Sequence, residues 1–219
     1  MKQRIYFPLV IIAAIMAMTL FSCTKDTEPA SLNEPIWPFA IGNKWVYLDS
    51  IHNMYSWHTT YDSVLITDKK TINGIEGYCQ HEEAPGNPVF CLGSDEQGNC
   101  LIVGGTSDIN QVSLNSIAYK NYPRVGEKWI LHNATYSEET GFTEDTLSFT
   151  CEGIDIPVKT QAGTFTCNAY SYSYYSGTTI HHVDKFVDYF ARGIGRVKSI
   201  HFEDGKIQSN STLINYFLK

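Results

Sequence analysis

The sequence predicts an all-β, antiparallel domain. Short runs rich in Val, Ile, Thr, Tyr and Phe alternate with polar residues, which is the period-two pattern of half-buried strands. Turn-forming dipeptides such as Asn73-Gly74 and Asp204-Gly205 separate these runs at hairpin-like intervals. A repeated segment indicates that the strands form two similar halves. Residues 107–119 depart from this pattern, and we expect a helix there because their apolar residues can share one helical face.

Residues 165–175 are the most regular of the predicted strands. Phe165, Cys167 and Ala169 fall on one face, whereas Tyr170 and Tyr172 fall on the other. A tyrosine face is amphipathic, because each ring is apolar and each hydroxyl is polar. It therefore predicts either the inner wall of a sheet or an exposed aromatic strip.

A short segment occurs twice in the chain. Residues 41–46, Ile-Gly-Asn-Lys-Trp-Val, recur as Val-Gly-Glu-Lys-Trp-Ile at residues 125–130. In each copy a glycine permits a tight turn and a tryptophan then opens a strand. We therefore predict a single β domain, residues 37–219, made of two similar meanders that share one sheet. The two pseudo-repeats cover about residues 38–121 and 122–219, too few units for a solenoid.

The first 22 residues are typical of an export signal. Lys2 and Arg4 precede an apolar run that is shorter than the roughly 20 residues needed to span a membrane. Residues 20–23, Leu-Phe-Ser-Cys, resemble the bacterial lipoprotein box, although Phe21 is bulkier than the usual occupant. This resemblance implies that Cys23 receives diacylglycerol and becomes the mature N-terminus, so that acyl chains anchor the protein to a membrane.

Residues 23–36 are polar and interrupted by prolines, as expected of a flexible tether between the lipid and the folded domain. Without Lys2 and Arg4, 14 basic residues face 23 acidic ones, a net charge of −9. Such a balance argues against nucleic acid as a partner and against charge-driven docking on anionic headgroups.

Three phrases together resemble a widespread set of exported lipoproteins of the Bacteroidetes type. They are Gly-Asn-Lys-Trp at residues 42–45, Ala-Gly-Thr-Phe at residues 162–165 and Gly-Ile-Gly-Arg-Val-Lys at residues 193–198. The chain has Gln161 where that set prefers proline. The resemblance implies a curved antiparallel sheet or open half-barrel, similar to bacterial lipoprotein-carrier folds. It also implies anchoring in the outer membrane, with the periplasmic or surface-exposed side left open, and it brings no catalytic residues.

Five cysteines remain after Cys23, and an exported protein meets an oxidising compartment in which cysteines can pair. A hairpin around Pro85-Gly86 would place Cys79 opposite Cys91. Cα atoms in such a pair lie about 4.5 Å apart, which is within disulfide reach.

A second pair is predicted on the same reasoning. A hairpin that turns near Lys159 would bring Cys151 close to Cys167 and leave Cys100 over. The alternative is that all five cysteines are small buried apolar residues.

No catalytic or cofactor motif stands out. The chain has no Gly-x-Ser-x-Gly, and its glycine-bearing turns lack the Lys-Ser/Thr ending of a phosphate loop. Adjacent histidines in a strand, such as His181-His182, point to opposite faces and cannot easily share a metal. His52 and His58, with Asp49 and Asp62, match no known ligand spacing. We therefore expect no cofactor, no metal site and no enzymatic activity.

Three short motifs resemble the Asp-Ser/Thr-apolar sequence that Bacteroidetes use for O-glycosylation of exported proteins. Their hydroxyl residues are Ser50, Ser63 and Thr146. The resemblance implies that these three residues are possible sites of modification.

Three functions from different classes remain. The 14 tyrosines and 11 phenylalanines could line a concave face that binds an apolar or glycan ligand. A structural module would instead dock another envelope protein by strand addition. A glycan-acting enzyme would need a pocket with perturbed titratable groups. Because no catalytic motif is found, we expect a lipid-anchored envelope lipoprotein that binds a ligand.

Overall fold

The computed structural model describes residues 34–53, 55–72, 74–82, 90–105, 116–137, 141–175 and 184–219. Every regular element in these ranges is a β-strand, which confirms the all-β prediction. No helix in them is long and apolar enough to cross a membrane. The strands are β1 (Lys44–His52), β2 (Trp57–Ile72), β3 (Ile75–Glu82), β4 (Phe90–Ser94), β5 (Cys100–Gly105), β6 (Ser116–Tyr119), β7 (Lys128–Ser137), β8 (Gly141–Thr160), β9 (Gly163–Tyr175), β10 (Asp184–Ala191), β11 (Gly195–Glu203) and β12 (Lys206–Phe217).

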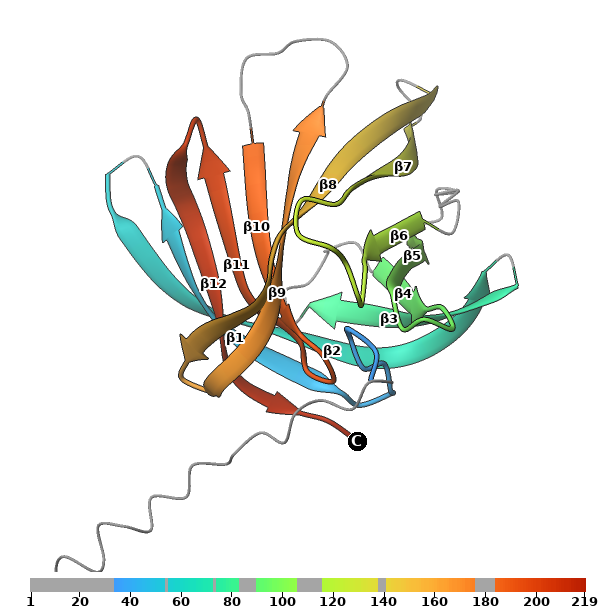
Figure 1. Ribbon diagram of the computed structural model, residues 1–219, viewed down its shortest axis with the longest axis horizontal. Helices are drawn as coiled ribbons and strands as arrows, with labels where there is room; N and C mark the ends of the chain where they lie inside the picture. The colour runs from blue at the N-terminus through green and yellow to red at the C-terminus, as the bar shows by residue number, and fades with distance from the viewer. Residues whose placement is uncertain are drawn as a thin grey trace, which may run out of the picture.

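The strands form one antiparallel sheet that curls into an open half-barrel (Figure 1). Strands β1 to β6 follow one another across one half of the sheet and β7 to β12 across the other, and β1 pairs with β12 where the halves meet. The predicted curved sheet of two meanders is therefore confirmed. We call the end with the β8–β9 and β10–β11 turns the closed end, and the end with the β1–β2 and β11–β12 turns the mouth.

The repeated segment makes the same turn in both meanders. Gly42 and Gly126 have φ values of +93° and +79°, which favour glycine. The amide of Gly42 donates to the carbonyl of Ile66, and the amide of Gly126 donates to the carbonyl of Cys151, each at 2.8 Å. In both copies the residue after the glycine accepts a return bond, from the amide of Ile66 or of Cys151. Each turn thus ties the start of a meander to its second strand, β2 or β8.

The expected helix at residues 107–119 is wrong at its C-terminal end. Residues 116–119 form strand β6, and Tyr119 pairs with Cys100 of β5. Ala118 is buried and the Tyr119 ring packs against Phe190, so pairing and burial outweigh the helical spacing. The rest of the predicted helix lies outside the described residues.

The segment before β1 fills the closed end. The amide of Ile36 donates to the carbonyl of Gly98, and the amide of Gly193 donates to the carbonyl of Pro35. Between these anchors, Trp37 is buried against three further aromatic rings, Phe39, Trp45 and Phe190. Gly195 has a φ of +99°, and a Cβ there would lie 2.6 Å from the Trp37 ring. The Gly-Ile-Gly phrase therefore makes room for this tryptophan.

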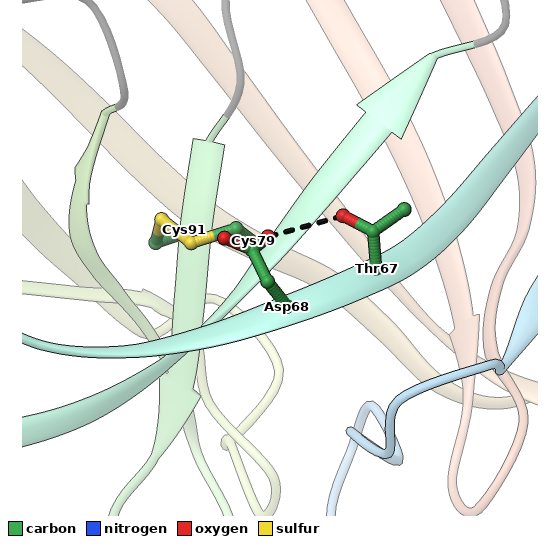
Figure 2. Close-up of a disulfide and its surroundings, with 4 residues drawn as sticks. All are labelled: Thr67, Asp68, Cys79 and Cys91. Carbon is green, nitrogen blue, oxygen red and sulfur yellow. Dashed lines mark hydrogen bonds between the residues drawn. A yellow bond between two sulfur atoms is a disulfide. The ribbon is translucent and has the colours of Figure 1, made fainter.

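A disulfide crosses the first meander. Cys79 of β3 and Cys91 of β4 are direct cross-strand partners, their Cα atoms are 3.9 Å apart, and their sulfur atoms are bonded. Figure 2 shows this bond beside Asp68, which accepts a hydrogen bond from Thr67. Both cysteines are fully buried.

The other predicted disulfide does not form in the structure. Cys151 and Cys167 are separate buried thiols, as is Cys100. They would meet only if the β8–β9 hairpin turned near Lys159, but its last pair is Thr160 with Gly163, and the two register shifts in β8 recover only part of this offset. Cys151 therefore faces Tyr170, and Cys167 faces Ile156.

These three thiols should be unreactive in the folded protein. Burial raises the pKa of Cys100 and of Cys151, and it raises the pKa of Cys167 to about 12, so the nucleophilic thiolate is scarce. We expect iodoacetamide at pH 8 to leave all three unlabelled in the native chain and to label them after denaturation, with peptide mass spectrometry as the readout. Labelling of Cys79 or Cys91 without prior reduction would contradict the disulfide.

Candidate functional site

Five rings stack side by side across five neighbouring strands. They are Trp129 of β7, Phe149 of β8, Tyr172 of β9, Phe186 of β10 and His201 of β11. Each ring is the cross-strand partner of the next. Successive centroids are 5.7, 4.9, 5.1 and 4.4 Å apart, with interplanar angles of 29° or less. This aromatic ladder stiffens one wall of the half-barrel, because each stacked pair adds about 0.5–1.5 kcal/mol beyond area burial.

The ladder shows where the tyrosine face of β9 lies. Tyr172 stacks within it, and Tyr170 is fully buried against Tyr119 and Phe190. Of the two sequence-based alternatives, the inner wall is right for these two tyrosines and the exposed strip is wrong.

A carboxylate and a guanidinium lie on β10 and β11, the two strands that carry the last rings of the ladder. Asp188 is fully buried, and its Oδ2 accepts a hydrogen bond of 2.5 Å from the hydroxyl of Tyr119, whereas its Oδ1 has no partner. The guanidinium of Arg196 lies over the Tyr47 ring, 4.9 Å from its centroid, and its Nε is buried without a hydrogen bond. The hydroxyl of Tyr47 donates to the backbone carbonyl of Arg196 at 3.0 Å.

Burial decides the protonation of the phenols in this cluster. It raises the pKa of Tyr47 to about 12, against the opposing effect of Arg196, and it raises the pKa of Tyr119 well above its usual value, with Asp188 adding to the effect. Burial alone would lower the pKa of Arg196, but Tyr47 and Asp188 outweigh it and the net change is upward. At neutral pH both phenols therefore act as hydrogen-bond donors and Arg196 keeps its charge.

A cavity of about 230 Å³ lies toward the mouth, where β11, β12 and β1 run side by side. Alternation places Asp49 and Ile51 on the same face of β1 as the buried Tyr47. Asp49 pairs with Ser211, and Ile51 pairs with Ser209. We call this cavity the mouth pocket; its lining consists of Asp49, Ile51, His52, His201, Gln208, Ser209, Asn210 and Ser211.

The mouth pocket offers a hydrogen-bond acceptor that the protein leaves unused. Oδ1 of Asp49 is buried and has no hydrogen-bond partner within the described part of the chain. Oδ1 of Asn210 is also buried without a partner, but Asn210 pairs with Ser50, so its side chain lies on the face of the sheet opposite to Asp49. The ring of His201 is held by Asp184, whose Oδ1 lies 3.2 Å from Nε2, and by stacking on Phe186. Among the residues that the structure describes, no lysine or arginine lines the cavity. The pocket can therefore receive a neutral or cationic ligand that donates hydrogen bonds.

A second hollow, of about 390 Å³, lies beside the N-terminal segment near Pro35 and Phe39. Two of its three described carboxylates are already engaged. Glu76 contacts Lys69 and accepts from Tyr78, and Asp95 accepts from the amides of Gln97 and Asn99. This hollow is therefore a weaker candidate for a binding site than the mouth pocket.

The predicted O-glycosylation sites differ in how far they are exposed. Ser63 is 3% exposed in β2, so the folded chain does not present its hydroxyl to an enzyme. Ser50 is partly exposed in β1. Thr146 belongs to β8, in a stretch whose side chains are not described, and Cys23 and His181-His182 lie outside the described residues.

The sequence alone did not identify any residue of the mouth pocket as part of a binding site. Asp49 and His52 were weighed among other histidines and acids, but their spacing indicated nothing, and the serine and amide residues of β12 carried no signal. The pairing of β1 with β12 brings them together. Nowhere in the described ranges do three or more His, Cys, Asp or Glu side chains gather as a metal site.

Comparison with known proteins supports the fold. A family model described as DUF3108-like matches residues 151–213, which run from β8 to β12. A crystal structure of a predicted lipoprotein from Parabacteroides distasonis is similar at a TM-score of 0.52 and 10% identity, over 84% of this chain and 99% of that one. A predicted exported protein with a YmcC-like fold from Bacteroides fragilis is similar at a TM-score of 0.51 and 14% identity, over 84% and 100%. No curated protein matched in sequence.

Proposed function

We propose that the protein is a non-enzymatic binding protein of the cell envelope, anchored in the outer membrane through Cys23, whose mouth pocket holds one sugar unit of a glycan. The observation that carries this proposal is the unused buried acceptor Asp49 Oδ1. Buried polar groups normally have partners, and leaving one without a partner costs about 1–3 kcal/mol. A hydroxyl group of a sugar would supply the missing donor.

The size and lining of the pocket favour a sugar over an acyl chain. Its volume of about 230 Å³ is below the range of roughly 300–1,000 Å³ that suits drug-sized ligands. Ile51 is the one apolar side chain in its described lining. The large apolar side chains of the closed end, among them Trp37 and Trp45, are buried against one another. A single ring with several hydroxyl groups matches such a cavity better than a long hydrocarbon does.

Replacing Asp49 with alanine should weaken sugar binding at least about tenfold, because a hydrogen bond to a charged group contributes about 1.5–3 kcal/mol. Isothermal titration calorimetry with a panel of neutral monosaccharides and oligosaccharides would measure this loss. Glu96→Ala, which removes the same charge at an exposed position near the closed end, is the matched control and should bind as the wild type does. Equal binding by Asp49→Ala would place the ligand elsewhere.

A further inference from the structure

The rim of the mouth pocket continues onto exposed aromatic rings. His52 lines the pocket, and its ring lies 5.2 Å from that of Trp57, its cross-strand partner at the end of the β1–β2 hairpin. Trp57 is 51% exposed, and Tyr55, in the turn just before it, is 91% exposed. The half-exposed indole of Trp57 therefore lies next to a residue of the pocket lining.

Local hydrogen bonds hold the hairpin that presents Trp57. Oδ1 of Asn53 accepts from the amides of Tyr55 and Ser56, at 3.1 and 2.8 Å, and the amide of Asn53 donates to the carbonyl of Ser56 at 3.0 Å. The side-chain amide of Asn53 also contacts the ring of His58. Asparagine bonds of this kind stabilise tight turns. The position of Trp57 is therefore set before any ligand arrives.

We infer that the ligand is an oligosaccharide of at least two units, with one unit in the mouth pocket and the next stacked on Trp57. This inference rests on the proposed function, because it extends the same site. A sugar ring has a polar edge of hydroxyl groups and an apolar face of C–H groups. The pocket supplies an acceptor for the edge, and the half-exposed indole supplies an apolar surface for the face of the neighbouring ring.

The charges around the site favour a neutral or amino-bearing sugar over an acidic one. Among the described lining residues, Asp49 is the one acidic side chain, and there is no lysine or arginine. An anionic sugar would meet this carboxylate with no cation to balance it. The overall formal charge of −7 acts in the same direction.

The test is the dependence of affinity on chain length. Titration calorimetry with gluco-, manno- and galacto-oligosaccharides of one to four units should show a gain of about three- to tenfold between one and two units, the size of one aromatic contact. Trp57→Ala should abolish this gain. Trp57→Phe should keep part of it.

Tyr61→Ala is the matched control, because Tyr61 is 74% exposed on the same strand, four residues farther from the turn. It should bind all chain lengths as the wild type does. If Trp57→Ala keeps the full gain, or if affinity does not rise from one unit to two, the inference is overturned while the proposed function stands. If no sugar of any length binds the wild-type protein, both the inference and the proposed function are overturned.

Discussion

Replacing Asp188 with alanine should destabilise the protein by about 3 kcal/mol or more. The substitution removes the acceptor of the Tyr119 hydroxyl and leaves that buried group without its 2.5 Å hydrogen bond. It also removes the negative charge that helps to balance Arg196, whose guanidinium contacts Tyr47. Urea denaturation, followed by tryptophan fluorescence, would give the change in the free energy of unfolding.

Two further variants separate these contributions. Asp188→Asn keeps an acceptor for Tyr119 but removes the charge, and Tyr119→Phe removes the hydrogen bond but keeps the charge. Each should cost less than Asp188→Ala. Asp184→Asn, on the same strand but partly exposed, should change stability by no more than about 1 kcal/mol. A loss below about 1 kcal/mol for Asp188→Ala would show that the cluster does not need its carboxylate.

Replacing Trp37 with alanine should cost about 3–5 kcal/mol, the usual range for a large aromatic side chain deleted from a core. Trp37 is 5% exposed and packs against Phe39, Trp45 and Phe190. Its loss would leave a cavity at the closed end and loosen the segment that precedes β1. The midpoint of urea unfolding and the protease sensitivity of residues 34–40 would report both effects.

Trp37→Phe is the matched control for this prediction. The indole Nε1 of Trp37 has no hydrogen-bond partner among the described residues, so phenylalanine loses ring volume but no hydrogen bond. It should cost clearly less than alanine. Ile41→Ala, at a position that is 50% exposed, should stay within about 0.5 kcal/mol of the wild type. Equal stability of Trp37→Ala and Ile41→Ala would mean that the N-terminal segment does not contribute to the core.

Short-range sequence patterns correctly predicted the strands and turns whose formation depends on neighbouring residues. Alternation predicted strands such as β9, and the two Gly-x-Lys-Trp segments predicted turns that prove to share one hydrogen-bond pattern. The expected helix at residues 107–119 was wrong where the chain can be followed, because helical spacing cannot reveal that Tyr119 pairs with β5 and enters the core. Pairing partners lie far apart along the chain, and short-range periodicity does not report them.

The cysteines show that a small error in the expected position of a turn changes which residues are cross-strand partners. Cys79 and Cys91 lie symmetrically about the expected turn and are bonded. The second hairpin turns slightly later than Lys159, which is enough to place Tyr170 opposite Cys151. Side chains alternate between faces along a strand, and cross-strand neighbours depend on the turn position and on bulges, so a shift of one or two residues changes every pair.

The sequence by itself determined the all-β class, the two meanders and the turns that start them, because strand alternation and turn preferences act over a few residues. Only the tertiary structure decided that Tyr170 and Tyr172 form an inner wall, that Asp188 is buried beside Tyr119, and that Asp49 lies next to β12. These arrangements depend on the β1–β12 pairing and on the curl of the sheet. The free energy of burial and of long-range pairing selects them, and no short motif carries that information.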